Sequence, residues 1–509
     1  MKKPNLLILM ADQLGASALP AYGNRVAKTP TIDALAAGGV VFDSFYCNSP
    51  LCAPSRFSFM SGRLPSQIGA YDNAAEFGAQ VPTFAHCLRI AGYQTALSGK
   101  MHFCGPDQLH GFEERLTTDI YPADFGWTPD WDRFEHRPSW YHDMNSVAQA
   151  GPCARTNQID FDEEVVHAAK QKLFDLARSR DQRPFMLLVS MTHPHDPYVI
   201  AQEYWDRYEG VEIDMPGVSL EPGQIDPHSR RIRHVIGLDL QPVNDVQVRA
   251  ARRAYYGAVS YVDERIGQIL GVLGETGLAQ DTIVLLIADH GDMLGERGLW
   301  YKMGFFEPAC RIPLIVHAPG RFAAHRVAES ASLLDLLPTL CDLGGADLQG
   351  SGVSGEGRSL VSAMRGGPGP DEVLGEYLAE GAIAPIVMIR RDRWKFIHSP
   401  VDPDQLFDLV SDPRELHNLA AEPAHRQRVA QFRQEVARRW DLPALNQAVR
   451  ASQRRRIFVN DALRTGHCTS WDYQPPYDAS RKFIRNSLDL PDLEARARLP
   501  GLTVGRPGR

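Results

Sequence analysis

The chain has no pair of cysteines at a spacing that is typical of metal or redox sites. Its eight cysteines are scattered, at positions 47, 52, 87, 104, 153, 310, 341 and 468. A zinc ribbon or a thioredoxin-like motif would need two of them close together. We therefore expect reduced thiols, which are typical of proteins in a reducing compartment.

Long apolar runs and an excess of basic residues are also missing. No segment approaches the roughly 20 apolar residues of a membrane span. The apolar run at residues 6–10 is too short for the core of a secretion signal, and Asp12 interrupts it. A net charge of −8 gives no basic footprint for nucleic acid. These absences predict a cytoplasmic protein without nucleic-acid or membrane partners.

Four apolar runs each lead directly into polar residues, and they indicate the fold class. They are residues 5–10, 95–98, 185–191 and 282–288. Runs without alternation are typical of strands that are covered on both faces. Helical patterns lie between them, at residues 84–91 and 254–273 for example. The pattern predicts a doubly wound α/β fold, whose mostly parallel sheet is flanked by helices.

The composition changes at the glycine- and proline-rich residues 366–370. We predict a catalytic α/β domain at 1–370 and a small α+β subdomain at 371–450. The latter would hold a hairpin (383–389 and 394–397) and a helix (423–440). A tail at 451–509 follows. Its residues Arg454 to Arg456 are interpreted as a solvated helix face, and its aromatic segment 471–477 predicts subunit contacts, hence a homodimer or homotetramer.

Polar residues that follow the first and last runs could bind a metal. Asp12 and Gln13 come after the first strand, and Asp289 and His290 after the last. In parallel sheets ligands bind beyond the carboxyl ends of the strands. Carboxylate oxygens with one imidazole suit a hard divalent cation, calcium first and manganese as the alternative. A helix cap is the other interpretation of Asp12.

Cationic side chains follow the two middle runs. Lys100 and His102 are two residues apart after one strand, so in extended chain both would face an oxyanion. His193 and His195 share this spacing after another strand, with the alternative that only one imidazole is functional. Lys302 follows a glycine-rich loop after the last strand.

The most informative motif is Cys-x-Pro-x-Arg, from Cys52 to Arg56. It is too tight for a phosphatase-type thiolate loop, and on its own it could be a buried cysteine before a turn. It resembles the signature of the sulfatase family within the alkaline phosphatase superfamily. Residues 92–102, 289–291, 310–314 and 406–409, followed by Asp412, Pro413 and Glu415, resemble further motifs of that family in the same order.

Two departures narrow the resemblance. The first strand ends in Asp-Gln rather than in two acids, and the second metal motif is Asp-His rather than Asp-Asn. Both occur in the branch that contains choline-sulfatases and phosphonate monoester hydrolases. Segments 51–54, 71–76, 99–113, 192–198 and 471–475 look closest to choline-sulfatase.

The resemblance implies a chemistry. A formylglycine-generating system would oxidise Cys52 to formylglycine, whose hydrate attacks the sulfur of choline sulfate beside one divalent cation. The implied metal ligands are Asp12, Gln13, Asp289, His290 and residue 52 itself. Arg56, Lys100 and His102 would position the nucleophile, and His195 and Lys302 would contact the sulfate and protonate the leaving oxygen. The implied substrate contacts are Asn73 for the sulfate, and Trp127, His142 and Glu380 for the choline head group.

Three alternatives remain open from the sequence. One is a phosphonate monoester hydrolase or phosphodiesterase, which shares the Asp-Gln and Asp-His ligands. Another is a broader alkyl or aryl sulfatase. The third is a non-enzymatic binder of choline-like osmolytes in which Cys52 stays unconverted, although such a binder has no need of Lys100, His102, His195 and Lys302 together.

Overall fold

The computed structural model describes residues 3–121, 124–138, 140–348, 353 and 355–466. The chain divides into a large unit, Met1–Arg464, and a C-terminal unit, Thr465–Arg509. Every element named below belongs to the large unit. The aromatic segment 471–477, with its predicted subunit contacts, lies outside the described residues.

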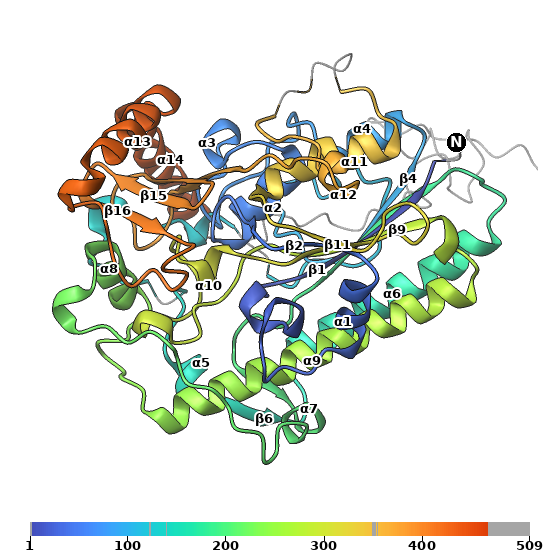
Figure 1. Cartoon of the computed structure of the whole chain (residues 1–509), viewed down its shortest axis with the longest axis horizontal. Helices are drawn as coiled ribbons and strands as arrows, with labels where there is room; N and C mark the ends of the chain where they lie inside the picture. The colour runs from blue at the N-terminus through green and yellow to red at the C-terminus, as the bar shows by residue number, and fades with distance from the viewer. Residues whose placement is uncertain (1–2, 122–123, 139, 349–352, 354, 467–509) are drawn as a thin grey trace, which may run out of the picture. The chain divides into compact units, whose positions relative to one another are not determined.

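The large unit is built on an eight-stranded mixed sheet with the order β11-β2-β10-β9-β1-β7-β4-β5 (Figure 1). Only β10 runs antiparallel to its neighbours, so the predicted mostly parallel sheet is confirmed. The strands are β1 (Asn5–Ala11), β2 (Val40–Phe42), β4 (Gln94–Gly99), β5 (Glu114–Arg115), β7 (Phe185–Met191), β9 (Thr282–Ala288), β10 (Leu314–His317) and β11 (His325–Val327).

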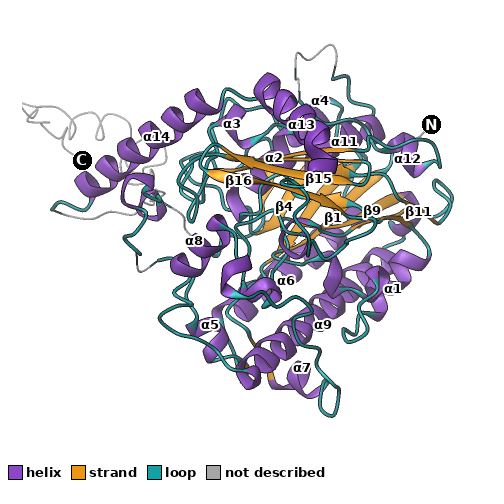
Figure 2. Ribbon diagram, turned by 60° about the vertical axis from the view of Figure 1, so that its left-hand side comes forward, coloured by secondary structure: helices purple, strands orange, loops and turns teal. Residues whose placement is uncertain are grey.

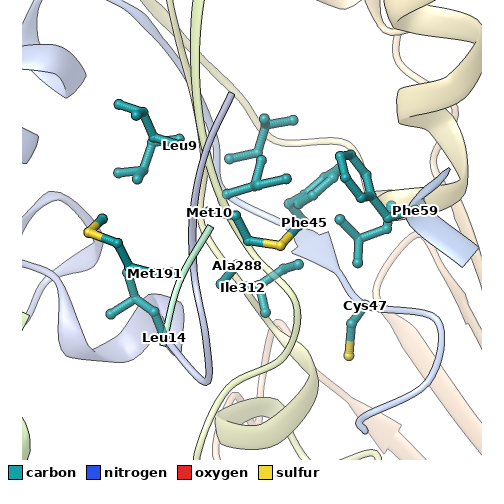
Figure 3. Packing of buried hydrophobic residues seen from close by; sticks show 14 of the residues in the cluster. Leu9, Met10, Leu14, Phe45, Cys47, Phe59, Met191, Ala288 and Ile312 are labelled. Carbon is teal, nitrogen blue, oxygen red and sulfur yellow. The ribbon is translucent and has the colours of Figure 1, made fainter. Parts of the chain in front are cut away.

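The four predicted apolar runs form the adjacent strands β9, β1, β7 and β4 at the centre of this sheet. Apart from the first residues of β1 and β4, every residue in them is buried. Figure 3 shows the reason for their continuous hydrophobicity, because Leu9 and Met10 point to opposite sides of β1 and both meet apolar neighbours.

Helices cover both faces of the sheet (Figures 1 and 2). The helices α1 (Pro30–Ala37), α6 (Asn157–Arg178) and α9 (Asp245–Glu275) lie on one face, and α2 (Cys52–Ser61), α4 (Phe84–Ile90) and α11 (Leu336–Gly344) lie on the other. The predicted helices at 84–91 and 254–273 correspond to α4 and to the central part of α9. Further helices are α3 (Pro65–Ile68), α5 (Asn145–Ala148), α7 (Gln202–Asp206), α8 (Pro227–Val235), α10 (Glu307–Cys310) and α12 (Val361–Met364). Two small two-stranded sheets pair β3 (Phe45–Tyr46) with β12 (Ala331–Ser332) and β6 (Gly151–Cys153) with β8 (Val199–Ala201).

A second, antiparallel sheet follows, with β13 (Glu372–Tyr377), β14 (Ile386–Arg391), β15 (Trp394–Ser399) and β16 (Asp402–Asp408) in chain order. The predicted hairpin corresponds to β14 and β15, whereas β13 was not predicted. Helix α13 (Arg426–Arg439) packs on this sheet, with Phe432 stacked on Phe396 at 5.2 Å between ring centroids. Helix α14 (Leu442–Leu463) is continuous across position 450, and the three-part domain division stays a proposal.

The interpretation of Arg454 to Arg456 as a solvated face is wrong for one of the three. Arg454 and Arg455 are exposed, but Arg456 is only 7% exposed and pairs with the buried Asp72. The helical spacing directs the Arg456 side chain toward the protein interior, where a guanidinium requires a carboxylate partner.

In the described part of the chain all seven cysteines are free thiols. None of the helices described is both long enough and apolar enough to span a membrane.

Candidate active site

The carboxyl ends of the four central strands meet at one edge of the sheet. Ala11, the last residue of β1, is in register with Met191 of β7 and Ala288 of β9. The residues that follow each strand therefore lie side by side, as expected. Gly99 ends β4 with φ of 105°, and a Cβ there would be 2.0 Å from the carbonyl oxygen of Ser190. Only glycine allows the backbone at position 99 to approach Ser190 this closely, and this approach places Lys100 at the edge of the sheet.

Cys52 is the first residue of α2, and the whole helix is buried. Pro54 is tolerated because the first turn needs no backbone N–H donor there. Arg56 comes one turn after Cys52, on the same face of the helix. Its guanidinium lies 3.2 Å from Asp12 Oδ2 and donates from Nε to Asp289 Oδ2 at 2.9 Å, so the motif ties α2 to both acidic strand ends.

Asp12, Cys52, Asp289 and His290 bring their ligand atoms within 4.8 Å of one another, and all four side chains are buried. Arg56 and Lys100 hold Asp12 Oδ2, while Asp12 Oδ1 faces Cys52 Sγ at 4.0 Å and His290 Nε2 at 3.8 Å. The carboxylate oxygens and the imidazole of this set fit a hard divalent cation. Asp12, Asp289, His290 and residue 52 could hold it.

Gln13 adjoins this cluster in a strained conformation, with φ of 63°. Its Nε2 donates to Asp292 Oδ2 at 2.6 Å, and its Oε1 accepts from Lys302 Nζ at 2.6 Å. Asp292 thereby fixes the amide so that its oxygen points to the cationic side of the site. The role of Gln13 as a metal ligand stays a prediction. Asp292 was not predicted, although it follows the predicted motif 289–291 directly.

Lys100 and His102 both reach the cluster from the segment after β4. Lys100 forms an ion pair with Asp12, and its Nζ lies 3.8 Å from Cys52 Sγ and 4.6 Å from the ring centroid of Tyr121. The backbone N–H of His102 donates to Asp119 at 2.8 Å, which holds φ at 61°. Both ring nitrogens of His102 are buried and have no hydrogen-bond partner among the described residues, so they are available to a bound molecule.

These cations set the charge state of the site. Burial alone would raise the pKa of the Asp12 carboxyl, but Lys100 and the other cations hold it well below its usual range. Burial likewise opposes ionisation of the Cys52 thiol, yet Lys100, Lys302 and His290 lower its pKa well below the usual 9.0. The surroundings of residue 52 therefore stabilise negative charge.

Of the two histidines after β7, only His195 faces the site. Its Nδ1 lies 2.7 Å from the carbonyl oxygen of Asp196, and its Nε2 lies 2.8 Å from Lys302 Nζ. A carbonyl only accepts, so Nδ1 carries the proton and Nε2 accepts from the lysine. His193 is instead held by Asp162 at 2.7 Å, which decides between the two interpretations of this segment.

A cavity of about 270 Å³ opens on this cluster. All four predicted substrate residues line it: Asn73, Trp127, His142 and Glu380. Trp127 stacks on Trp140 with ring centroids 6.3 Å apart, and Asn73 Oδ1 accepts from the N–H of Ala53 at 3.0 Å. Tyr121, Trp140 and Asp196 also line the cavity and were not predicted. Only Asp196 had a signal in the sequence, since it is adjacent to His195.

Glu380 is a carboxylate with an open side toward the cavity. It is only 4% exposed, and its Oε2 has no hydrogen-bond partner in the part of the chain that the structure describes. Burial raises the pKa of Glu380 to about 7, and the nearby Asp72 adds to the shift. A cation in the cavity would supply the missing partner and stabilise the charged form.

Comparisons with known proteins agree with this geometry. The family model described as Sulfatase matches residues 4–346, and the one described as Choline sulfatase enzyme C terminal matches residues 447–499. The chain is 48% identical to Choline-sulfatase of Rhizobium meliloti (strain 1021), over 98% of this chain and 99% of that protein. It is 27% identical to Arylsulfatase of Clostridium perfringens (strain 13 / Type A), over 85% of this chain and 93% of that protein.

Solved structures confirm the predicted fold. The crystal structure of phosphonate monoester hydrolase of Agrobacterium radiobacter matches with a TM-score of 0.66 at 23% identity, covering 89% of this chain and 96% of that one. The family model covers well over half of the chain, and the relative from Rhizobium meliloti matches almost end to end. The chain therefore belongs to the sulfatase family.

Proposed function

We propose that the protein is a choline-sulfatase, which hydrolyses choline sulfate to choline and inorganic sulfate. Membership of the sulfatase family makes it a sulfuric ester hydrolase. The choice of substrate rests on the cavity together with the likeness to Choline-sulfatase of Rhizobium meliloti (strain 1021).

The observation that carries the proposal is that one small cavity is lined both by cationic side chains beside Cys52 and by the carboxylate of Glu380 with two tryptophans. Lys100 and His102 lie beside Cys52 at the reactive end, and Trp127, Trp140 and Glu380 line the same cavity. Choline sulfate has the matching charges. Its quaternary ammonium cannot donate hydrogen bonds, so recognition needs aromatic faces and a carboxylate, and each cation–π contact contributes about 0.5–2 kcal/mol.

The nucleophile in this proposal is Cys52 after conversion to formylglycine. The conversion is a two-electron oxidation that replaces sulfur by oxygen, and a separate formylglycine-generating system with its own electron acceptor would perform it. One hydroxyl of the hydrated aldehyde bonds to sulfur while the bond from sulfur to the choline oxygen breaks. The second hydroxyl then loses its proton, the aldehyde re-forms, and sulfate departs with the electrons of the broken C–O bond.

The other residues would prepare these steps. A divalent cation, when bound, would lower the pKa of the hydrate and neutralise sulfate oxygens. Asp12, Gln13, Asp289 and His290 would hold that cation, and Arg56, Lys100 and His102 would orient the hydroxyls. Lys302 would pass a proton through His195 Nε2 to the leaving oxygen, since that nitrogen already accepts from the lysine.

The test is sulfate release from choline sulfate, compared with turnover of a phenyl phosphonate monoester and of 4-nitrophenyl sulfate. We expect the highest kcat/KM for choline sulfate, with an aldehyde mass for the Cys52 peptide of the same sample. Faster turnover of the phosphonate or of 4-nitrophenyl sulfate would overturn the substrate. Tight choline binding with an intact Cys52 thiol and no sulfate release would instead indicate the non-enzymatic binder.

The finer properties of the protein are also proposals. We place it in the cytoplasm as a homodimer or homotetramer, with calcium as the resident ion and manganese as the alternative. Domains at 1–370, 371–450 and 451–509 complete the proposed organisation. The free thiols of the described cysteines support a reducing location.

The ion can be identified without an activity assay. A ligand that binds only the folded state raises the melting temperature, and the rise grows with its affinity. We expect calcium to raise the Tm of chelator-treated protein more than the same concentration of manganese. Asp289→Asn should remove the calcium response, because it withdraws one of the two carboxylates. An equal or larger response to manganese would contradict the assignment.

The pKa of Glu380 predicts how the KM for choline sulfate depends on pH. The carboxyl is largely neutral below its pKa of about 7 and charged above it. A cationic head group binds the charged form, so the KM should fall as pH rises, by roughly tenfold between pH 6 and 8 if only the ionised carboxylate binds the head group. Glu380→Gln should raise the KM and flatten the profile. A flat profile in the wild type would exclude this contact.

A further inference from the structure

One face of the C-terminal helix α14 is bonded to the loops that form the wall of the substrate cavity. Arg450, Gln453 and Arg456 are spaced by three residues, so they share this face. Arg450 donates from Nη2 to the carbonyl oxygen of Ile383 at 2.7 Å. Gln453 Oε1 accepts from the backbone N–H of Trp131 at 3.0 Å. Two loops that are distant in sequence, those of Trp131 and Ile383, are thus bonded to one helix, and the loop of Asp72 is the third.

Arg456 makes the strongest of these contacts. Its Nη1 and Nη2 donate to the two carboxylate oxygens of Asp72 at 2.6 and 2.7 Å, and its Nη1 lies 3.3 Å from Thr128 Oγ1. Its Nε donates to Ser452 Oγ at 3.2 Å, which fixes the guanidinium on the helix. Arg456 is 7% exposed and Asp72 is fully buried, so this bidentate pair is well shielded from water.

Two of the loops place a cavity residue directly beside their contact to α14, since Asn73 follows Asp72 and Trp127 precedes Thr128. Glu380 is linked to α14 less directly. It follows Ala379, whose carbonyl oxygen accepts from Trp131 Nε1 at 3.0 Å, and the backbone N–H of Trp131 donates to Gln453 of α14. A shift of any of these contacts would therefore move a side chain of the cavity wall.

The two ends of the cavity depend on α14 to different degrees. Asn73, at the sulfate end, has an anchor of its own, because its Oδ1 accepts from the N–H of Ala53 in α2. Thr128 is tied to its own loop by Phe125 and to the rest of the protein by Arg456. Loss of Arg456 would thus remove a tie of the aromatic wall, whereas Asn73 would keep its own anchor on α2.

We propose that α14 sets the specificity for the head group, with Arg456 as the positioning residue that holds the Trp127 loop against the Asp72–Asn73 loop. The inference rests on the proposed function, since it concerns the choline end of that substrate. It gives α14 a role in recognition that the helix exerts through the loops it holds.

The test compares choline sulfate with 4-nitrophenyl sulfate, which has no quaternary ammonium, in Arg456→Gln and in the neighbouring control Arg455→Gln. Arg455 is exposed on the same helix. We expect Arg456→Gln to lower kcat/KM for choline sulfate by about 10- to 100-fold, mainly through KM. The kcat/KM for 4-nitrophenyl sulfate should fall by no more than about threefold. The control should match the wild type, and Arg456→Lys should recover part of the loss.

Thr128→Val serves as a second variant if Arg456→Gln does not fold. It keeps the pair with Asp72 and removes the hydroxyl that accepts from Arg456 and donates to the carbonyl oxygen of Phe125, so the preference for choline sulfate should fall in the same direction. Equal losses of kcat/KM on both substrates, or an unchanged preference for choline sulfate, would overturn the role of α14 and leave the proposed function intact. A wild type without preference for choline sulfate would instead remove the proposed function and this inference with it.

Discussion

Replacing Cys52 by serine should stop the enzyme after a single round, with one equivalent of choline released and the protein left sulfated. Serine has one hydroxyl, which can attack sulfur but cannot supply the second deprotonation that expels sulfate. We expect the steady-state rate to fall by at least about 1,000-fold. A choline burst of one equivalent and a gain of one sulfuryl group in the intact mass would record the trapped state. Serine is nearly isosteric at this buried helix start, so the fold should persist.

Two controls make this result specific. Cys52→Ala has no hydroxyl, and it should give neither a burst nor a mass increase. Cys153→Ser changes a partly exposed thiol in β6 and should keep wild-type turnover. Sustained turnover by the serine variant, or an intact thiol at position 52 in active wild type, would refute a formylglycine nucleophile.

The reactive end of the site could be predicted from sequence because it depends on sheet topology. Asp12, Lys100, His195 and Asp289 each follow an apolar run, and the runs are adjacent parallel strands that end at one edge. Strand ends need no knowledge of side-chain packing to be placed together. The spacing of Cys52 and Arg56, one turn apart in a single helix, helped in the same way.

The head-group residues could be named only through the family resemblance, because they come from irregular loops whose meeting no sequence pattern predicts. Trp127 and Glu380 lie 253 positions apart and are connected through Trp131 and α14. The pair of Asp72 and Arg456 spans 384 residues. Without that partner an arginine in a polar helix is most simply interpreted as exposed, and here the tertiary structure overrides that default.

The proton route predicts a second large effect, which should depend on the leaving group. Lys302 is 1% exposed and donates to both His195 Nε2 and Gln13 Oε1. An alkoxide such as that of choline leaves poorly unless it is protonated, and general acid assistance contributes about 10²–10⁴-fold. Lys302→Met should therefore lower kcat/KM for choline sulfate by about that factor. Nitrophenolate needs no proton to depart, so 4-nitrophenyl sulfate should lose much less.

The difference between the two substrates separates proton delivery from charge stabilisation. Lys302 also places a positive charge near the sulfate, and loss of that charge would slow both substrates equally. His195→Gln should show the same dependence on the leaving group, since it interrupts the route after the lysine. Asp162→Asn is the matched control, because it loosens the neighbouring His193 without touching the route. Equal losses on choline sulfate and 4-nitrophenyl sulfate in Lys302→Met would reduce the lysine to an electrostatic role and would leave the leaving oxygen without its proposed acid.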